Sequence, residues 1–261
     1  MKIFSALRFV GLGLATAGAI TATQTVSAKE FAGGEIAASA AVSNIYLFRG
    51  IDQSSSITGS GSGSGAISGD INYSHSGAYA GVWATSGFAG TNETDVYLGY
   101  GIELDSGLSV DLNVTSYVYA GNDSGPSFIM NGGADQVADF SEVILTVGYS
   151  TDDISGSVLY ADNVSGDTGY TYLAFSAEFG DISATLGIHD PEEAALQTFD
   201  NDITHLDVTY SYNDNLSFTL SKVVAVDDEI NVNNTTEYVG GSWIDVDDDT
   251  LFVVSYSLPI E

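Results

Sequence analysis

Apolar and polar side chains alternate with a period of two residues through most of this sequence. In one clear run, Leu108, Leu112 and Val114 are apolar, whereas Asp111 and Asn113 between them are polar. Successive side chains of a β-strand point to opposite faces of the sheet, so each such segment forms a strand with one apolar and one polar face. Helical periodicity is nearly absent, and the pattern therefore predicts an all-β fold.

We count about twelve alternating segments, an even number within the range of bacterial outer-membrane barrels. The predicted strands are 35–49, 66–74, 78–86, 93–104, 107–120, 139–149, 153–162, 169–179, 181–189, 203–213, 215–225 and 250–258. Short turns alternate with longer connections, which fall at 50–65, 87–92, 121–138, 163–168, 190–202 and 226–249. This alternation predicts a transmembrane antiparallel up-and-down β-barrel with short periplasmic turns, long outer loops and both termini in the periplasm.

Aromatic residues favour a membrane barrel over a soluble β-sandwich. Strand parity alone does not separate the two, because a sandwich buries the same apolar face between its sheets. Four aromatic residues each close a strand before a short turn and share the parity of that strand's apolar face; they are Tyr73, Tyr149, Phe179 and Tyr212. Aromatic side chains at the strand ends, on the lipid-facing side, form the interfacial girdle of membrane barrels.

The N-terminus predicts export. Lys2 and Arg8 precede a short apolar stretch over 9–20, and Val26-Ser27-Ala28 is a small-residue cleavage pattern. These features are typical of a secretory signal peptide over 1–28, since the apolar stretch is too short for a membrane anchor. We expect residues 29–261 to form the barrel in the cell outer membrane.

The charge balance excludes several classes of partner. After the signal segment, three basic residues remain against 35 acids, a formal net charge of −32. Nucleic acid is excluded because no basic stripe exists to neutralise phosphates. The chain has no cysteine, so stability must come from a large core or from a membrane.

Three stretches of the sequence resemble the TorF porin family, a proteobacterial group of outer-membrane β-barrels. They are Ser43-Asn44-Ile45-Tyr46-Leu47-Phe48-Arg49-Gly50-Ile51-Asp52-Gln53-Ser54, residues 77–86 and residues 93–100. The resemblance implies a barrel that passes small solutes, and its partners would be outer-membrane lipid, lipopolysaccharide and the barrel-assembly machinery. The sequence departs from the family at Asp52, where a small hydroxyl residue is usual, and in the last strand, which lacks the usual terminal aromatic.

Polar residues on the strand faces opposite the apolar ones are candidates for a pore lining. The acidic candidates are Asp70, Asp95, Glu103, Asp111, Glu142 and Asp207. Such a wall favours cations or neutral polar solutes over anions. Arg49, one of three basic residues left after the signal, has two interpretations: a guanidinium at the pore mouth that sets selectivity, or a structural ion pair that holds the first loop.

Two other kinds of site are weaker candidates. The acidic run at Asp245, Asp247 and Asp249 offers oxygen ligands for a divalent cation, but charge runs of this kind are usually solvated loops. His205 and Asp207 would supply two members of a hydrolase site, yet a catalytic assignment needs a third positioned group.

The sequence therefore predicts a porin-like channel for passive diffusion of small polar solutes, cationic or net neutral, with no cofactor and no enzymatic step. The alternative is a non-conducting surface protein whose acidic loops bind divalent cations or mediate adhesion. The solute and the oligomeric state are not determined by the sequence.

Overall fold

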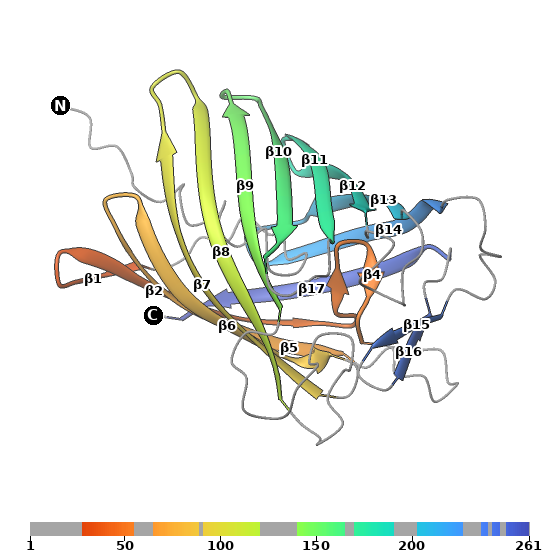
Figure 1. Cartoon of the computed structure of the whole chain (residues 1–261). Helices are drawn as coiled ribbons and strands as arrows, with labels where there is room; N and C mark the ends of the chain where they lie inside the picture. Colours follow the sequence, from red (N-terminus) through yellow and green to blue (C-terminus); the bar gives the residue numbers. More distant parts are fainter. Residues whose placement is uncertain are drawn as a thin grey trace.

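The computed structural model describes residues 28–54, 65–88, 91–120, 140–164, 170–190, 203–226, 236–239, 242–245 and 249–260, and Figure 1 shows the chain. The strands are β1 Ala28–Phe31, β2 Gly34–Ser43, β3 Leu47–Phe48, β4 Ile51–Asp52, β5 Ala66–His75, β6 Ala78–Phe88, β7 Thr91–Glu103, β8 Leu108–Ala120, β9 Phe140–Ser150, β10 Ile154–Asn163, β11 Thr171–Phe179, β12 Ile182–Asp190, β13 Ile203–Ser211, β14 Leu216–Val226, β15 Thr236–Val239, β16 Ser242–Asp245 and β17 Leu251–Pro259. Within these ranges there is no helix long and apolar enough to cross a membrane.

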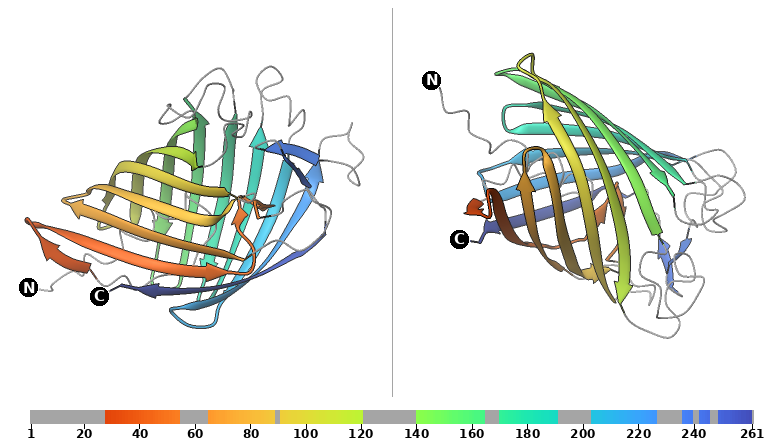
Figure 2. Two further views of the ribbon diagram at one scale, coloured as in Figure 1. Left: turned by 90° about the horizontal axis from the view of Figure 1, so that it is seen from below. Right: turned by 60° about the vertical axis from the view of Figure 1, so that its left-hand side comes forward.

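Twelve of these strands form a closed antiparallel β-barrel, which confirms the predicted fold. Each strand from β5 to β14 pairs with the next in the chain, β14 pairs with β17, and β17 pairs with β2. The ring closes because β2 also pairs with β5 along its whole length, from Glu35↔Ser74 to Ser43↔Ala66. Figure 2 shows the strands arranged around a central space.

Strands β1 and β17 both pair with one edge of β2. Strand β17 pairs with the C-terminal half of β2 and ends where Pro259 lies opposite Ser39. Strand β1 then continues the same edge, with Ala28 opposite Ala37. The two ends of the described chain therefore meet along β2, at the end of the barrel that carries the short turns.

The apolar face of the strands points outward. Leu98 is 60% exposed, Leu112 52% and Leu220 51%, although these are among the most hydrophobic residues of their strands. Their polar strand neighbours, such as Asn113 and Thr219, are buried inside the ring. An exposed apolar surface of this extent is unfavourable in water and is typical of a surface in contact with lipid. The β-sandwich alternative is wrong, because a sandwich would bury these side chains between its sheets.

The predicted boundaries of the barrel strands agree with the structure to within two residues, except at the end of the first strand. The connection predicted over 226–249 contains a hairpin, β15–β16, and the connection predicted over 87–92 is shorter than expected, because β6 continues to Phe88 and β7 begins at Thr91. The β6–β7 ladder continues into this segment with a register shift between Thr85 and Phe88. The predicted signal segment lies outside the described residues except for Ala28, which begins β1.

The wrong boundary is the end of the first barrel strand, predicted at residue 49 and found at Ser43. Asn44 ends it, because its side-chain amide donates to the Phe252 carbonyl and accepts from the Val254 N–H of β17. The Asn44 side chain thus makes the two hydrogen bonds to β17 that the backbone of a further β2 residue would make, and the chain leaves the barrel wall.

The segment that leaves the wall forms a small hairpin, β3–β4, inside the barrel (Figure 2). Its two-residue turn is Arg49-Gly50, with φ of 49° and 80°. Two successive positive φ values define the hairpin turn whose twist matches that of the strands, and glycine suits its second position. The Gln53 N–H donates to the Tyr46 carbonyl at 2.8 Å and closes the base of the hairpin.

Candidate functional site

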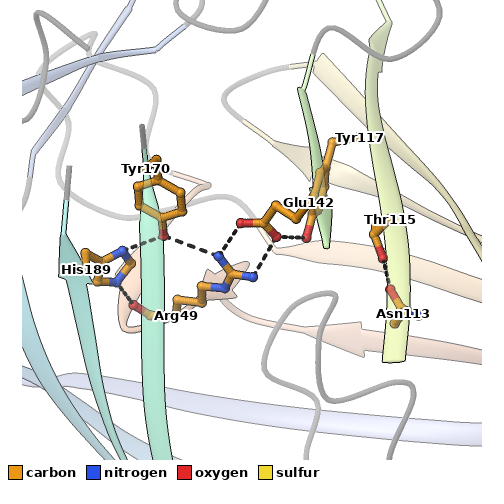
Figure 3. Close-up of polar contacts among 7 residues, drawn as sticks. All are labelled: Arg49, Asn113, Thr115, Tyr117, Glu142, Tyr170 and His189. Atoms are coloured by element: carbon orange, nitrogen blue, oxygen red, sulfur yellow. Dashed lines mark hydrogen bonds and ion pairs between the residues drawn. The ribbon is translucent and has the colours of Figure 1, made fainter. Parts of the chain in front are cut away.

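The hairpin is fixed to the barrel wall by an ion pair between Arg49 and Glu142. Glu142 is the third residue of β9 and faces inward. Arg49 Nη1 and Nη2 each donate to one Glu142 carboxylate oxygen at 2.8 Å, a bidentate geometry (Figure 3). Arg49 is 7% exposed and Glu142 0%. Burial lowers the pKa of Arg49, but the Glu142 carboxylate raises it above its ordinary value, so the guanidinium remains charged.

Aromatic groups surround the guanidinium. Its central carbon lies 4.4 Å from the centroid of the Tyr172 ring and 4.8 Å from that of Phe48. Arg49 Nη1 also donates to the Tyr170 hydroxyl at 3.3 Å. Contacts of a cation with ring faces add to the ion pair, most strongly where water is excluded. The charge is therefore held on three sides by strands β9 and β11 and by the hairpin itself.

Two histidines hold the backbone of the hairpin tip. His189 on β12 contacts the Arg49 carbonyl through Nε2 at 2.8 Å and the Tyr170 hydroxyl through Nδ1 at 2.8 Å (Figure 3). The His205 ring packs against Gly50 so closely that a Cβ at residue 50 would overlap it. The tip thus fits against the wall only because residue 50 lacks a side chain.

His205 itself is held by polar neighbours on the wall. Its Nε2 contacts the Tyr172 hydroxyl at 3.0 Å, and its Nδ1 lies 3.2 Å from Asp207 Oδ1. A Cβ at Gly187, the residue opposite His205 on β12, would overlap both rings. His205 and Asp207 therefore lie side by side, and the His205 ring packs against the tip of the hairpin.

The other side of the hairpin contacts strands β6 to β8. Tyr46 donates its hydroxyl to Glu93 Oε2 at 3.0 Å, and its ring lies 5.8 Å from that of Trp83. Phe48 meets the ring of Tyr117 edge to face at 6.2 Å. Tyr117 in turn donates to Glu142 Oε2 at 2.7 Å (Figure 3). The hairpin thus lies across the lumen, bound to wall segments on both sides.

Two predicted acids lie farther from the hairpin and pair with tyrosines. Asp70 on β5 accepts from the Tyr97 hydroxyl at 2.6 Å and from Asn72 at 2.7 Å. Asp111 on β8 accepts from the Tyr79 hydroxyl at 2.8 and 3.0 Å. Both carboxylates are buried and face inward, as the strand parity predicted.

Small hydroxyl residues line the remaining wall toward the short turns. Thr209 and Thr219 share a hydrogen bond of 2.8 Å between their hydroxyls, and Ser176 and Thr185 share another of 2.8 Å. The inward-facing Ser217, Ser255 and Ser257 continue this surface on β14 and β17. We call the set of Ser176, Thr185, Thr209, Thr219, Ser217, Ser255 and Ser257 the hydroxyl wall.

The predicted site residues divide into three groups. Arg49 and Glu142 form one network with the hairpin, whereas Asp70, Asp95, Asp111 and Asp207 face the lumen elsewhere on the wall. Glu103 has the predicted parity but is exposed at the short-turn end of β7. Of the candidate metal ligands, Asp245 ends β16, Asp249 lies just before β17, and Asp247 lies outside the described residues, so this prediction stays untested.

Sequence reasoning missed part of the network. Glu93 has the same parity as Asp95, two residues away, so the alternation could have identified it. Tyr172 and His189 also have the parity of the inward face, but nothing in the alternation links them to Arg49, because only the inward fold of residues 44–54 brings Arg49 to them.

Comparisons with known proteins give one family match. The profile of a family described as "Bacterial protein of unknown function (Gcw_chp)" matches residues 27–256. Among solved structures, the KdgM porin is similar at 10% identity and a TM-score of 0.48, covering 86% of this chain and 99% of that chain. OccAB3 of Acinetobacter baumannii is similar at 9% identity and a TM-score of 0.41, covering 90% and 67%. A mutant of the Rh. blastica porin is similar at 12% identity and a TM-score of 0.40, and the match covers 89% of this chain and 75% of that chain. No curated protein sequence matches the chain.

Proposed function

The chain belongs to the Gcw_chp family of bacterial proteins of unknown function, and on that premise we propose that it is an outer-membrane channel for passive diffusion of small polar solutes. The observation that carries the proposal is the orientation of the two strand faces. The closed barrel turns its apolar face outward and encloses carboxylates, hydroxyls and amides. That arrangement suits a protein that spans lipid and contacts polar solutes inside.

The charges of the lumen support a preference for cations or neutral solutes. Among the described residues, six buried acids face inward against one buried arginine. The acids are Asp70, Glu93, Asp95, Asp111, Glu142 and Asp207. Low-dielectric walls strengthen the field of such charges, which attracts cations and repels anions.

The hairpin supplies the constriction of the proposed channel. Residues 44–54 belong to the first of the three stretches that resemble the TorF porin family, and they fold inward at the long-loop end of the barrel. A segment folded into the lumen narrows it and limits the size of the solute. Arg49 would thus act mainly as the anchor of this constriction, because both its terminal nitrogens are engaged by Glu142.

The hairpin fills the lumen at the long-loop end of the barrel, which also favours a second candidate, a non-conducting surface barrel. Tyr46, Leu47 and Ile51 of the hairpin are buried, and Tyr46 and Ile51 pack with Trp83 into an apolar cluster inside the ring. If the hairpin never leaves, the long connections outside would carry the function through adhesion or cation binding.

Single-channel recording separates the two candidates. The protein, purified as a folded barrel in detergent, is added to a planar lipid bilayer between unequal KCl solutions. A channel gives discrete steps and a reversal potential displaced toward that of potassium. Absence of steps from protein that still migrates faster on a gel before boiling than after would overturn the channel proposal. Loss of an adhesion or cation-binding activity on deletion of 226–249 would then support the surface protein.

A further inference from the structure

Lys222 is the one lysine or arginine on the lipid-facing side of the described barrel strands. It is exposed on the outer face of β14, between Leu220, which is 51% exposed, and Val224, which is 50% exposed. Leu206, 39% exposed, lies opposite it on β13. Apolar residues thus flank Lys222 along and across the strand, and Val224 extends the apolar surface past it toward the long connections. The charge therefore lies within the lipid-facing belt and not beyond its edge.

No acidic side chain neutralises this lysine in the described ranges. The ion pairs there are Arg49–Glu142 and His205–Asp207, although the chain carries 35 acids. A lysine on the lipid face of a barrel is unfavourable, and its cost falls as the charge approaches an interface. Ionisable residues in the membrane region are rare and mark functional sites. An unpaired cation in this belt therefore points to an anionic partner supplied by the membrane.

The interface nearer to Lys222 is the one at the long connections. Lys222 lies closer to Val226, where β14 ends, than to Leu216, where it begins. A lysine extends its flexible stem toward the interface while its methylene groups stay on apolar surface. Its ammonium group carries a full charge and three N–H donors, which suit the oxygens of a phosphate. The partner is thus a phosphate at the long-loop side of the membrane.

An apolar surface lies on the other side of Lys222, toward the short turns. The rings of Phe218 and Phe252 are stacked, with centroids 6.1 Å and planes 9° apart. Leu220 pairs with Phe252 across the β14–β17 ladder, and both side chains are 51% exposed. A lipid whose phosphate contacts Lys222 would lay its acyl chains along these residues. Charge and apolar surface therefore follow one another in the order of a lipid head group and its chains.

We propose that Lys222 binds a phosphate group of lipopolysaccharide, whose acyl chains lie against Leu220, Phe218 and Phe252. Long outer loops place this end of the barrel at the outer leaflet, where lipopolysaccharide supplies the phosphate. The assignment rests on the outer-membrane orientation of the proposed function and not on conduction. Lys29 provides the contrast, because it is exposed on β1, at the short-turn end of the barrel.

Native mass spectrometry of the whole barrel in detergent measures its affinity for lipid A with its phosphates and for lipid A from which they have been removed. The wild type is expected to bind the phosphorylated form more tightly. K222Q should weaken binding of that form about tenfold, the scale of a hydrogen bond to a charged group, and leave binding of the dephosphorylated form unchanged. K222R keeps the charge and should keep most of the affinity. The shift between unboiled and boiled samples on a gel shows that each variant is folded.

K29Q is the matched control, because it removes the same charge from the opposite end of the barrel and should leave the affinity unchanged. Equal affinities of wild type and K222Q overturn the proposal, as does an equal loss in K29Q, which would indicate attraction by net charge alone. Binding of phosphatidylglycerol as tight as that of lipid A also overturns it, since the site would then accept any anionic lipid. A wild type that binds lipid A through Lys222 without conducting overturns the channel and supports this site.

Discussion

The two halves of the lumen are built from different interactions. Toward the long connections, a hairpin from one part of the chain is held by an ion pair to Glu142, by ring contacts with Tyr172 and by the imidazole of His189. Toward the short turns, the hydroxyl wall consists of small residues that bond mainly to neighbours on the next strand, such as Thr209 with Thr219.

This difference shows where single side chains control the structure. A contact such as Thr209–Thr219 lies within a ladder that backbone hydrogen bonds already fix, so its loss leaves the strands in place. In the described residues no ladder joins the hairpin to the ring; it is held through its own ends, its side chains and the wall histidines at its tip, and the Arg49–Glu142 contact joins residues 93 positions apart. The long-loop half is thus the part that a point mutation can reorganise.

Replacing residues 45–53 by a short Gly-Ser linker is expected to have the largest effect. The barrel should still close, because none of its ladders includes the hairpin strands. Removal of a group that fills the lumen should raise the single-channel conductance several-fold. Unchanged conductance would show that the hairpin is not the constriction. A linker of equal length inserted at the 151–153 turn serves as the control.

The ion pair is expected to carry the next largest effect. E142A leaves the guanidinium of Arg49 buried without its partner, and such a loss destabilises by about 3–5 kcal/mol. Urea unfolding of the barrel in detergent measures it.

The double variant R49M with E142L tests whether this loss comes from the unpaired charge. It should recover much of the stability, because an apolar pair of similar volume often replaces a buried ion pair without loss. Equal destabilisation by the single and double variants would contradict this explanation.

The turn of the hairpin should respond to G50A. A Cβ there would overlap the His205 ring, and residue 50 has a positive φ. We expect about 1–3 kcal/mol of destabilisation from the backbone conformation alone, and a larger or noisier channel conductance as the tip leaves its seat. G77A at the β5–β6 turn has the same type of φ but lies at the short-turn end. It should affect stability without changing conductance.

The smallest effect is expected on the hydroxyl wall. T209V removes one side-chain hydrogen bond within a continuous ladder, so the free energy of unfolding should fall by about 0.5–1.5 kcal/mol. Conductance should stay close to that of the wild type. A change in conductance as large as that of G50A would show that the narrowest point lies on the hydroxyl wall and not at the hairpin.

The sequence by itself determined the twelve barrel strands and, through their alternation, which residues face inward. Alternation has a period of two, which is a local property of extended chain, so parity placed Asp70, Asp111 and Glu142 inside the ring without knowledge of any neighbour. It also placed Glu103 on the polar face, but it did not show that this residue stays exposed at the rim.

Only the tertiary structure decided where the chain leaves the wall and what Arg49 contacts. Residues 35–49 contain no clear stop signal, and the strand ends at Ser43 because Asn44 bonds to β17, more than 200 residues later. Partners so far apart in the chain leave no periodic trace in the sequence, since their meeting depends on ring closure. The fold therefore follows from local alternation, whereas the site follows from contacts that exist only once the barrel is complete.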